Sequence, residues 1–163
     1  MSESINQVTL TLGLLVTFAG VFLAFTLDRA IDRIKRIQAK NELLKNLACE
    51  LSELKKNLTG DAYRLYPDIW DSAVASGQLE LLTSEQVTNL ANVYRKIKGT
   101  DYEAIRVRDA REAYMMRAPN PYTNLEENWT DLSKRHLVRM EETKALIDEI
   151  LKEPWLSRYV EKS

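Results

Sequence analysis

The sequence predicts an all-α protein, in which a long N-terminal transmembrane helix continues into a three- or four-helix antiparallel bundle. Three observations lead to this fold class. The 163 residues include only 5 Gly and 4 Pro, so few positions favour turns. Apolar residues recur at helical rather than alternating spacing along most of the chain. Near the N-terminus, 20 successive residues carry no charge.

The uncharged segment is Val8–Leu27, VTLTLGLLVTFAGVFLAFTL. At about 1.5 Å per residue it spans roughly 30 Å, the thickness of the hydrocarbon core of a bilayer. A cleaved signal peptide would begin with basic residues, but the preceding residues contain Glu3 and no Lys or Arg. A buried helix of a soluble protein seldom lacks charge around its whole circumference. We therefore predict a transmembrane helix.

The charges that flank this segment predict its orientation. Residues 28–40 hold five basic and two acidic side chains, a net charge of +3, and no basic residue precedes the segment. The positive-inside rule then places the N-terminus outside the cell membrane and residues 28–163 in the cytoplasm, with residues 1–27 as flank and single span. The same basic residues are predicted to contact anionic lipid headgroups, although a pure topology signal is the simpler alternative. They are Arg29, Arg33, Lys35, Arg36 and Lys40.

Small or weakly polar residues form a line along the predicted span. Small residues on one face let helices approach closely in lipid, so this line predicts self-association. An alternative is that part of the face lines a pore, although the span has no charged ring to select ions. The line consists of Gly13, Thr17, Gly20 and Ala24, with Asn6 and Thr9 near its outer end.

The first helix is expected to run from Ile5 to Leu58, because no helix breaker occurs before Gly60. Within it, leucines from Leu44 to Leu58 recur at spacings of 3, 4, 3 and 4, which is a heptad seam. A short helix with Pro67 in its first turn is expected to end at Gly77. Only Gln78–Leu82 alternates as a strand would, and it is too short to build a sheet.

Two further helices are marked by their ends. Thr83 and Gln86 have the spacing of a capping box, which opens a helix that runs through Met116. The segment 118–122, with two prolines, ends it. A second capping box, Thr123 with Glu126, opens the last helix, and Pro154 stops it. We expect the tail after Pro154 to pack back onto the body.

From Trp70 to Ile97 the sequence has the form W-x5-S-G-x-L-x-L-L-x-x-E-x4-L-x3-Y-x2-I. With the upstream apolar segment that runs into a Leu-rich helix, this resembles a loose class of uncharacterised prokaryotic proteins that have one N-terminal transmembrane helix and a cytoplasmic helical bundle. The resemblance implies architecture and transfers no site.

Residue types that carry chemistry are sparse. The net charge of −1 argues against nucleic acid as a partner. Cys49 is the single cysteine, which excludes an intrachain disulfide. His136 is the single histidine and is predicted to be partly buried and hydrogen-bonded, while the carboxylates, Glu50 among them, are predicted on solvated helix faces. The sequence predicts no catalytic, metal or cofactor site, and so no enzyme.

The predicted function is that of a membrane-anchored homo-oligomer that acts as a scaffold, sensor or regulatory subunit. Its expected partners are the lipid bilayer and further copies of the chain. The alternative is an oligomeric ion channel, or a membrane-permeabilising effector, gated by the cytoplasmic domain.

Overall fold

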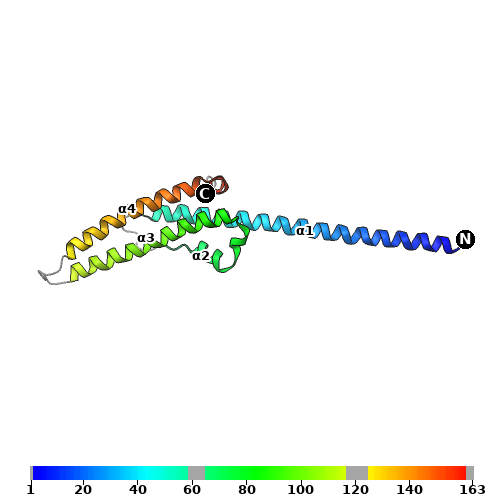
Figure 1. Cartoon of the computed structure of the whole chain (residues 1–163), viewed down its shortest axis with the longest axis horizontal. Coiled ribbons are helices and arrows are strands. Elements are labelled where there is room, and N and C mark those ends of the chain that lie inside the picture. Colours follow the sequence, from blue (N-terminus) through cyan, green and yellow to red (C-terminus); the bar gives the residue numbers. More distant parts are fainter. Residues whose placement is uncertain (1, 59–64, 117–124, 161–163) are drawn as a thin grey trace. The chain divides into compact units, whose positions relative to one another are not determined.

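The computed structural model describes residues 2–58, 65–116 and 125–160, apart from the side chains of residues 2–15 and 125. The described chain is entirely helical, which confirms the all-α prediction (Figure 1). Gln78–Leu81, within the one segment that alternates as a strand would, forms a 3-10 helix. The elements are α1 (Ser2–Asn57), α2 (Asp68–Ala75), the 3-10 helix η1 (Gln78–Leu81), α3 (Ser84–Met116), α4 (Leu125–Lys152) and α5 (Pro154–Val160).

The chain divides into two compact units, Met1–Asn41 and Glu42–Ser163. The first unit is the N-terminal part of α1. Among the described residues, no helix has the length and apolar character that crossing a membrane requires. The predicted span Val8–Leu27 therefore has no support from them, and the side chains of residues 8–15 lie outside the description. The span stays a prediction.

The second unit, here called the body, is built around one face of α1. The five leucines of the predicted seam are exposed by 5% or less, so the seam is confirmed as core. A fully buried Leu contributes about 1.5–3 kcal/mol of transfer free energy, so this face is a large part of what holds the body together. The seam packs in one cluster with Leu90, Val93, Tyr94 and Ile97 of α3 and Met140, Ile147 and Ile150 of α4.

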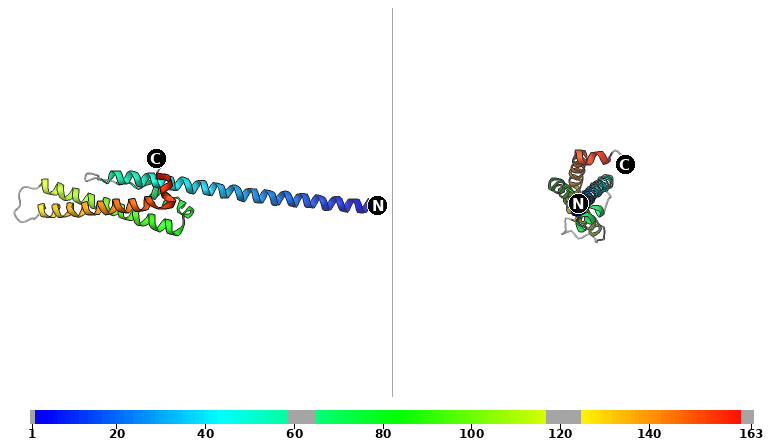
Figure 2. Two further views of the ribbon diagram at one scale, coloured as in Figure 1. Left: turned by 90° about the horizontal axis from the view of Figure 1, so that it is seen from above. Right: turned by 90° about the vertical axis from the view of Figure 1, so that its right-hand side faces the viewer.

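Helices α3 and α4 form the predicted antiparallel pair. Thr100 and Thr143 share a hydrogen bond of 2.8 Å inside their interface, and Lys96 reaches Glu142 at 2.6 Å on its edge. The part of α1 within the body runs in the same direction as α3, however, so a uniformly antiparallel bundle was wrong (Figures 1 and 2). In the sequence, α2 and η1 lie between these two helices.

The predicted helix ends are largely confirmed. The backbone N–H of Gln86 donates to Thr83 Oγ1 at 3.2 Å, and the N–H of Thr83 donates to Gln86 Oε1 at 3.1 Å, as a capping box requires. Gly77 follows α2 with a φ of 72°, the left-handed conformation that glycine adopts without strain. The box at Thr123, like the break at 118–122, lies outside the described residues.

The C-terminal tail packs on the body, as expected. Helix α4 ends at Lys152, and Pro154 begins α5, where its missing N–H removes no hydrogen bond. Leu156 of α5 is fully buried in the core cluster. The chain after the last long helix therefore contributes to the core.

Leu51→Ala should lower the free energy of unfolding by about 2–5 kcal/mol, because it leaves a cavity in the centre of the seam. Denaturant unfolding of the full chain in mild detergent measures the loss. Val138→Ala is the matched control, because Val138 is 60% exposed and should change stability by less than about 0.5 kcal/mol. Equal effects of the two substitutions would show that the seam is not the core.

Candidate functional site

The predicted packing face of α1 is open where its side chains are described. Thr17, Gly20 and Ala24 are exposed, and a Cβ atom added at Gly20 would meet nothing within 4 Å. Asn6, Thr9 and Gly13 belong to the residues whose side chains are not described. The large apolar residues around the same turns are between 63% and 73% exposed. These are Val16, Phe18, Val21, Phe22 and Leu23.

The predicted headgroup-binding residues follow on the same helix. Arg29, Arg33, Lys35 and Arg36 are exposed, and Lys40 is partly buried. The guanidinium carbon of Arg29 lies 4.2 Å from the centroid of the Phe25 ring, which is cation–π geometry. This contact lies at the point where the apolar segment gives way to charge.

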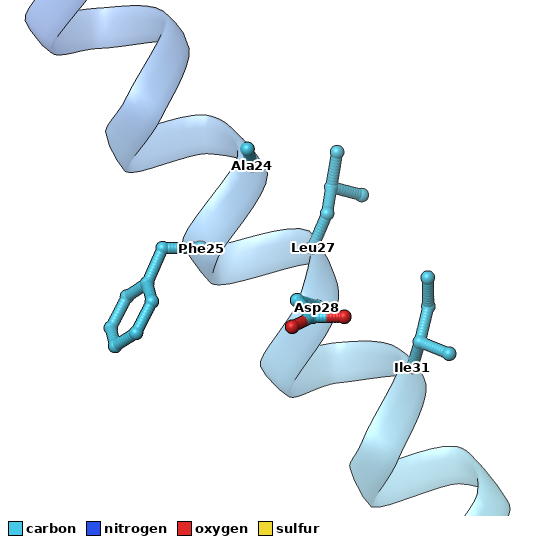
Figure 3. A pocket seen from close by; sticks show the side chains of 5 residues that line it. All are labelled: Ala24, Phe25, Leu27, Asp28 and Ile31. Atoms are coloured by element: carbon cyan, nitrogen blue, oxygen red, sulfur yellow. The ribbon is translucent and has the colours of Figure 1, made fainter.

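An open hollow follows this stretch of α1 (Figure 3). Leu27 and Ile31 project from one side of the helix and Phe25 from the other. Because all the lining residues belong to one helix, the hollow has no second wall to enclose a small molecule. It is lined by Ala24, Phe25, Leu27, Asp28 and Ile31.

The body contains a buried carboxylate that the sequence analysis misplaced. Glu50 of α1 is only 6% exposed, so its predicted place on a solvated face was wrong. Its Oε1 accepts the backbone N–H of Ile69 at 2.6 Å, and its Oε2 accepts the N–H of Trp70 at 3.3 Å. The Tyr94 hydroxyl donates to Oε2 at 2.6 Å. One side chain of α1 therefore holds both α2 and α3.

The position of Glu50 has a physical reason in α2. The N-cap of that helix is Pro67, which provides no side-chain hydrogen bond, so the first N–H groups need an acceptor from elsewhere. A carboxylate is favoured there, because it accepts these N–H groups and faces the positive end of the helix dipole. An N-cap without Ser, Thr, Asp or Asn was the one sequence signal for this contact.

Charge and burial oppose each other at this cluster. Burial raises the pKa of Glu50, although the hydrogen bonds from Tyr94, Ile69 and Trp70 act to lower it. Burial and the neighbouring Glu50 carboxylate raise the pKa of Tyr94, which keeps its hydroxyl protonated as a donor. The Trp70 and Tyr94 rings stack with centroids 4.7 Å apart. The contacts on both carboxylate oxygens give Glu50 a structural role.

His136 lies in the interface of α3 and α4. It is 6% exposed, but among the described residues its Nδ1 has no hydrogen-bond partner, so the predicted hydrogen-bonded histidine was only half right. Burial lowers the pKa of His136, with Arg139 acting in the same direction and Glu103 against it. Glu103 and Arg139 form an ion pair across the same interface.

Neither cluster has the composition of a metal or catalytic centre. Within the described ranges, no group of three or more His, Cys, Asp or Glu side chains is placed to hold a metal ion. Cys49 is a free thiol whose Sγ lies 4.0 Å from Glu53 Oε1. Among the described residues, the exposed apolar face of α1 is a feature that the core does not use.

Comparison with protein-family models, curated proteins and solved structures finds no match for this chain. The resemblance of Trp70–Ile97 to membrane-anchored helical proteins therefore stays a prediction.

A double-mutant cycle of Glu50→Ala and Tyr94→Phe should give a coupling energy of about 1.5–3 kcal/mol, the usual value for a hydrogen bond to a charged group. Denaturant unfolding of the four full-length proteins measures it. The control cycle is Lys98→Ala with Asp71→Ala, an ion pair of 2.6 Å whose side chains are 51% and 52% exposed. Exposed pairs couple by less than about 1 kcal/mol. Equal coupling in both cycles would contradict a buried network at Glu50.

Stability should fall as the pH falls through about 6.5, the ordinary pKa of histidine. In the folded chain burial lowers the pKa of His136, so below that pH the unfolded chain binds a proton that the folded chain does not. Unfolding between pH 8 and pH 5 measures the slope, and His136→Gln should reduce it. Because burial raises the pKa of Glu50, that residue contributes with the opposite sign in both proteins. An unchanged slope in His136→Gln would exclude this role.

Proposed function

We propose that the chain is a single-pass membrane protein that associates with copies of itself through its N-terminal helix. It presents a rigid helical body in the cytoplasm as a scaffold, sensor or regulatory subunit. The lipid bilayer and further copies of the chain are its partners in this proposal.

One observation carries the proposal: two apolar stretches of the same helix have opposite exposure. The large apolar residues described between Val16 and Leu27 are 53–73% exposed, whereas the seam from Leu44 to Leu58 is exposed by at most 5%. Scattered apolar residues are normal on a soluble surface, but a contiguous patch of this kind marks an interaction site. The residues lie around the whole circumference of the helix, which lipid tails can cover and a single protein partner cannot.

The backbone of α1 supports the same proposal. Ser2–Asn57 is one unbroken helix, so its N–H and C=O groups are paired within the segment, as a lipid environment demands. The basic residues follow the apolar segment and none precedes it, so the positive-inside rule favours a cytoplasmic body. The body has one packed apolar core, which suits a rigid module.

The test is a double substitution in the proposed span, Phe18→Asp with Val21→Asp. Each Asp near the centre of a membrane helix costs about 2.5–3.5 kcal/mol on insertion scales. The fraction of protein that floats with lipid vesicles in a density gradient should therefore fall at least about tenfold, since 1.4 kcal/mol is a factor of ten. Val74→Asp with Val138→Asp is the matched control, because both positions are 50% or more exposed in the body.

Wild-type protein that stays out of the vesicle fraction would overturn the proposal, as would flotation of the span variant. The orientation is measured in intact cells, where an impermeant maleimide should label Cys49 only after permeabilisation. Ion flux through vesicles that contain the purified protein would favour the channel alternative over the scaffold.

A further inference from the structure

The apolar face of α1 continues beyond the proposed span. Leu27, Ile31, Ile34 and Ile37 are between 47% and 56% exposed. Their spacings of 4, 3 and 3 place them on one side of the helix. Figure 3 shows Leu27 and Ile31 on the same side. Residues past Leu27 would lie outside the hydrocarbon core, so lipid tails do not explain this face.

The opposite face of the same turns is basic. Arg29, Arg33, Arg36 and Lys40 are spaced 4, 3 and 4 residues apart, roughly half a turn away from Leu27, Ile31 and Ile34. Ile37 lies at the border between the two faces. This part of α1 is thus an amphipathic helix with one apolar and one cationic side. A helix of this pattern buries its apolar side and leaves its charges in water.

We infer that residues 24–37 form a parallel coiled coil with other copies of this chain. The inference rests on the proposed function, because chains inserted in one orientation can meet only in parallel. Ala24, Leu27, Ile31 and Ile34 follow spacings of 3, 4 and 3, the heptad pattern of a coiled-coil core. Gly20 lies four residues before Ala24, so the coil continues the line of small residues from the span.

Continuity of the helix argues against a membrane surface as the occupant of this face. α1 has no break between the apolar segment and the body, and lying flat on the bilayer would need a sharp kink. Kinks arise at Pro, at Gly or at inserted groups, and residues 21–57 contain neither Pro nor Gly. The helix therefore projects from the membrane with its apolar face uncovered by lipid.

The charges beside this face and the local concentration of the chain both favour a second copy as its partner. In a parallel pair one flank of the core meets the opposite flank of the neighbour. Asp28 and Lys35 lie on one flank, whereas Ala30 and Ile37 lie on the other, so no like charges are set directly opposite each other. Membrane anchoring also holds the copies at high local concentration, which strengthens a short interface.

The residue types in the core of the proposed coiled coil indicate how many chains it contains. Ile31 and Ile34 occupy the two alternating core positions, and isoleucine at both favours three or more strands over two. The leucine seam from Leu44 to Leu58 cannot extend this coiled coil between copies, because other helices of the same chain already bury it. The proposed coil is therefore confined to the part of α1 that precedes the body.

Cysteine cross-linking in lipid vesicles tests the inference. In a Cys49→Ser background, Leu27→Cys, Ile31→Cys and Ile34→Cys should each give cross-linked dimers on mild oxidation, because a disulfide requires Cα atoms within about 7 Å. Arg29→Cys, Arg33→Cys and Arg36→Cys on the basic face are the matched set. We expect at least fivefold more dimer from the apolar set. Equal yields, or more dimer from the basic set, would overturn the coiled coil.

A second variant measures the mass of the assembly. Wild-type protein in mild detergent should have at least three times the 18.8 kDa of one chain, and Ile31→Lys with Ile34→Lys should lower that mass. Val74→Lys with Val138→Lys is the control and should keep it. An unchanged mass in the isoleucine variant overturns the coiled coil. Vesicle flotation distinguishes failure of the coiled coil from failure of membrane anchoring. Protein that floats but fails both tests refutes the coil alone, whereas protein that does not float refutes membrane anchoring and the coil with it.

Discussion

Burial of one face of α1 is the constraint on which the body depends. The leucines from Leu44 to Leu58 lie among side chains of α3 and α4, and no other described element supplies a comparable apolar face to that cluster. An isolated helix gains little from its own hydrogen bonds, so its stability in water comes from such packing. With this face withdrawn, α3 and α4 would be left as a two-helix hairpin with polar groups inside its interface.

The Glu50 contacts turn this packing into a specific arrangement. Apolar burial has no direction, so it fixes that the helices meet but only weakly fixes their register. The Glu50 carboxylate has three donors at set positions on α2 and α3, and a shifted register would leave a charge buried without partners. The short helix α2, which lacks a cap of its own, is ordered by the same contact.

The apolar residues of α1 are exposed before Asn41 and buried after Glu42, because only the second stretch is covered by other helices of the chain. Past Glu42, α3 and α4 cover the apolar face, and there it is core. Before Asn41, the described apolar residues are exposed on all sides, and a contiguous apolar patch of this kind marks an interaction site. The basic residues lie between the two stretches, and in the proposed function they give the helix its direction across a membrane.

The elements whose causes are local could be predicted from the sequence. The capping box at Thr83, the left-handed Gly77 and the stop at Pro154 depend on residues within one or two turns, so spacing alone locates them. The heptad seam is equally local, because its 3-4 spacing is a property of one helix. The predicted packing face and the basic residues of α1 also follow from local spacing, although the sequence does not identify what they contact.

The contacts that join distant segments could not be predicted from the sequence and are seen only in the fold. Glu50 looked like one more surface carboxylate, because its donors lie 19, 20 and 44 residues away in the sequence. The parallel course of α1 and α3 is a property of how the helices pack together, which the periodicity of each helix does not record. The missing partner of His136 Nδ1 depends on which side chains of α3 face it. Periodicity reports which side of a helix is buried, but the neighbours on that side are set by the fold.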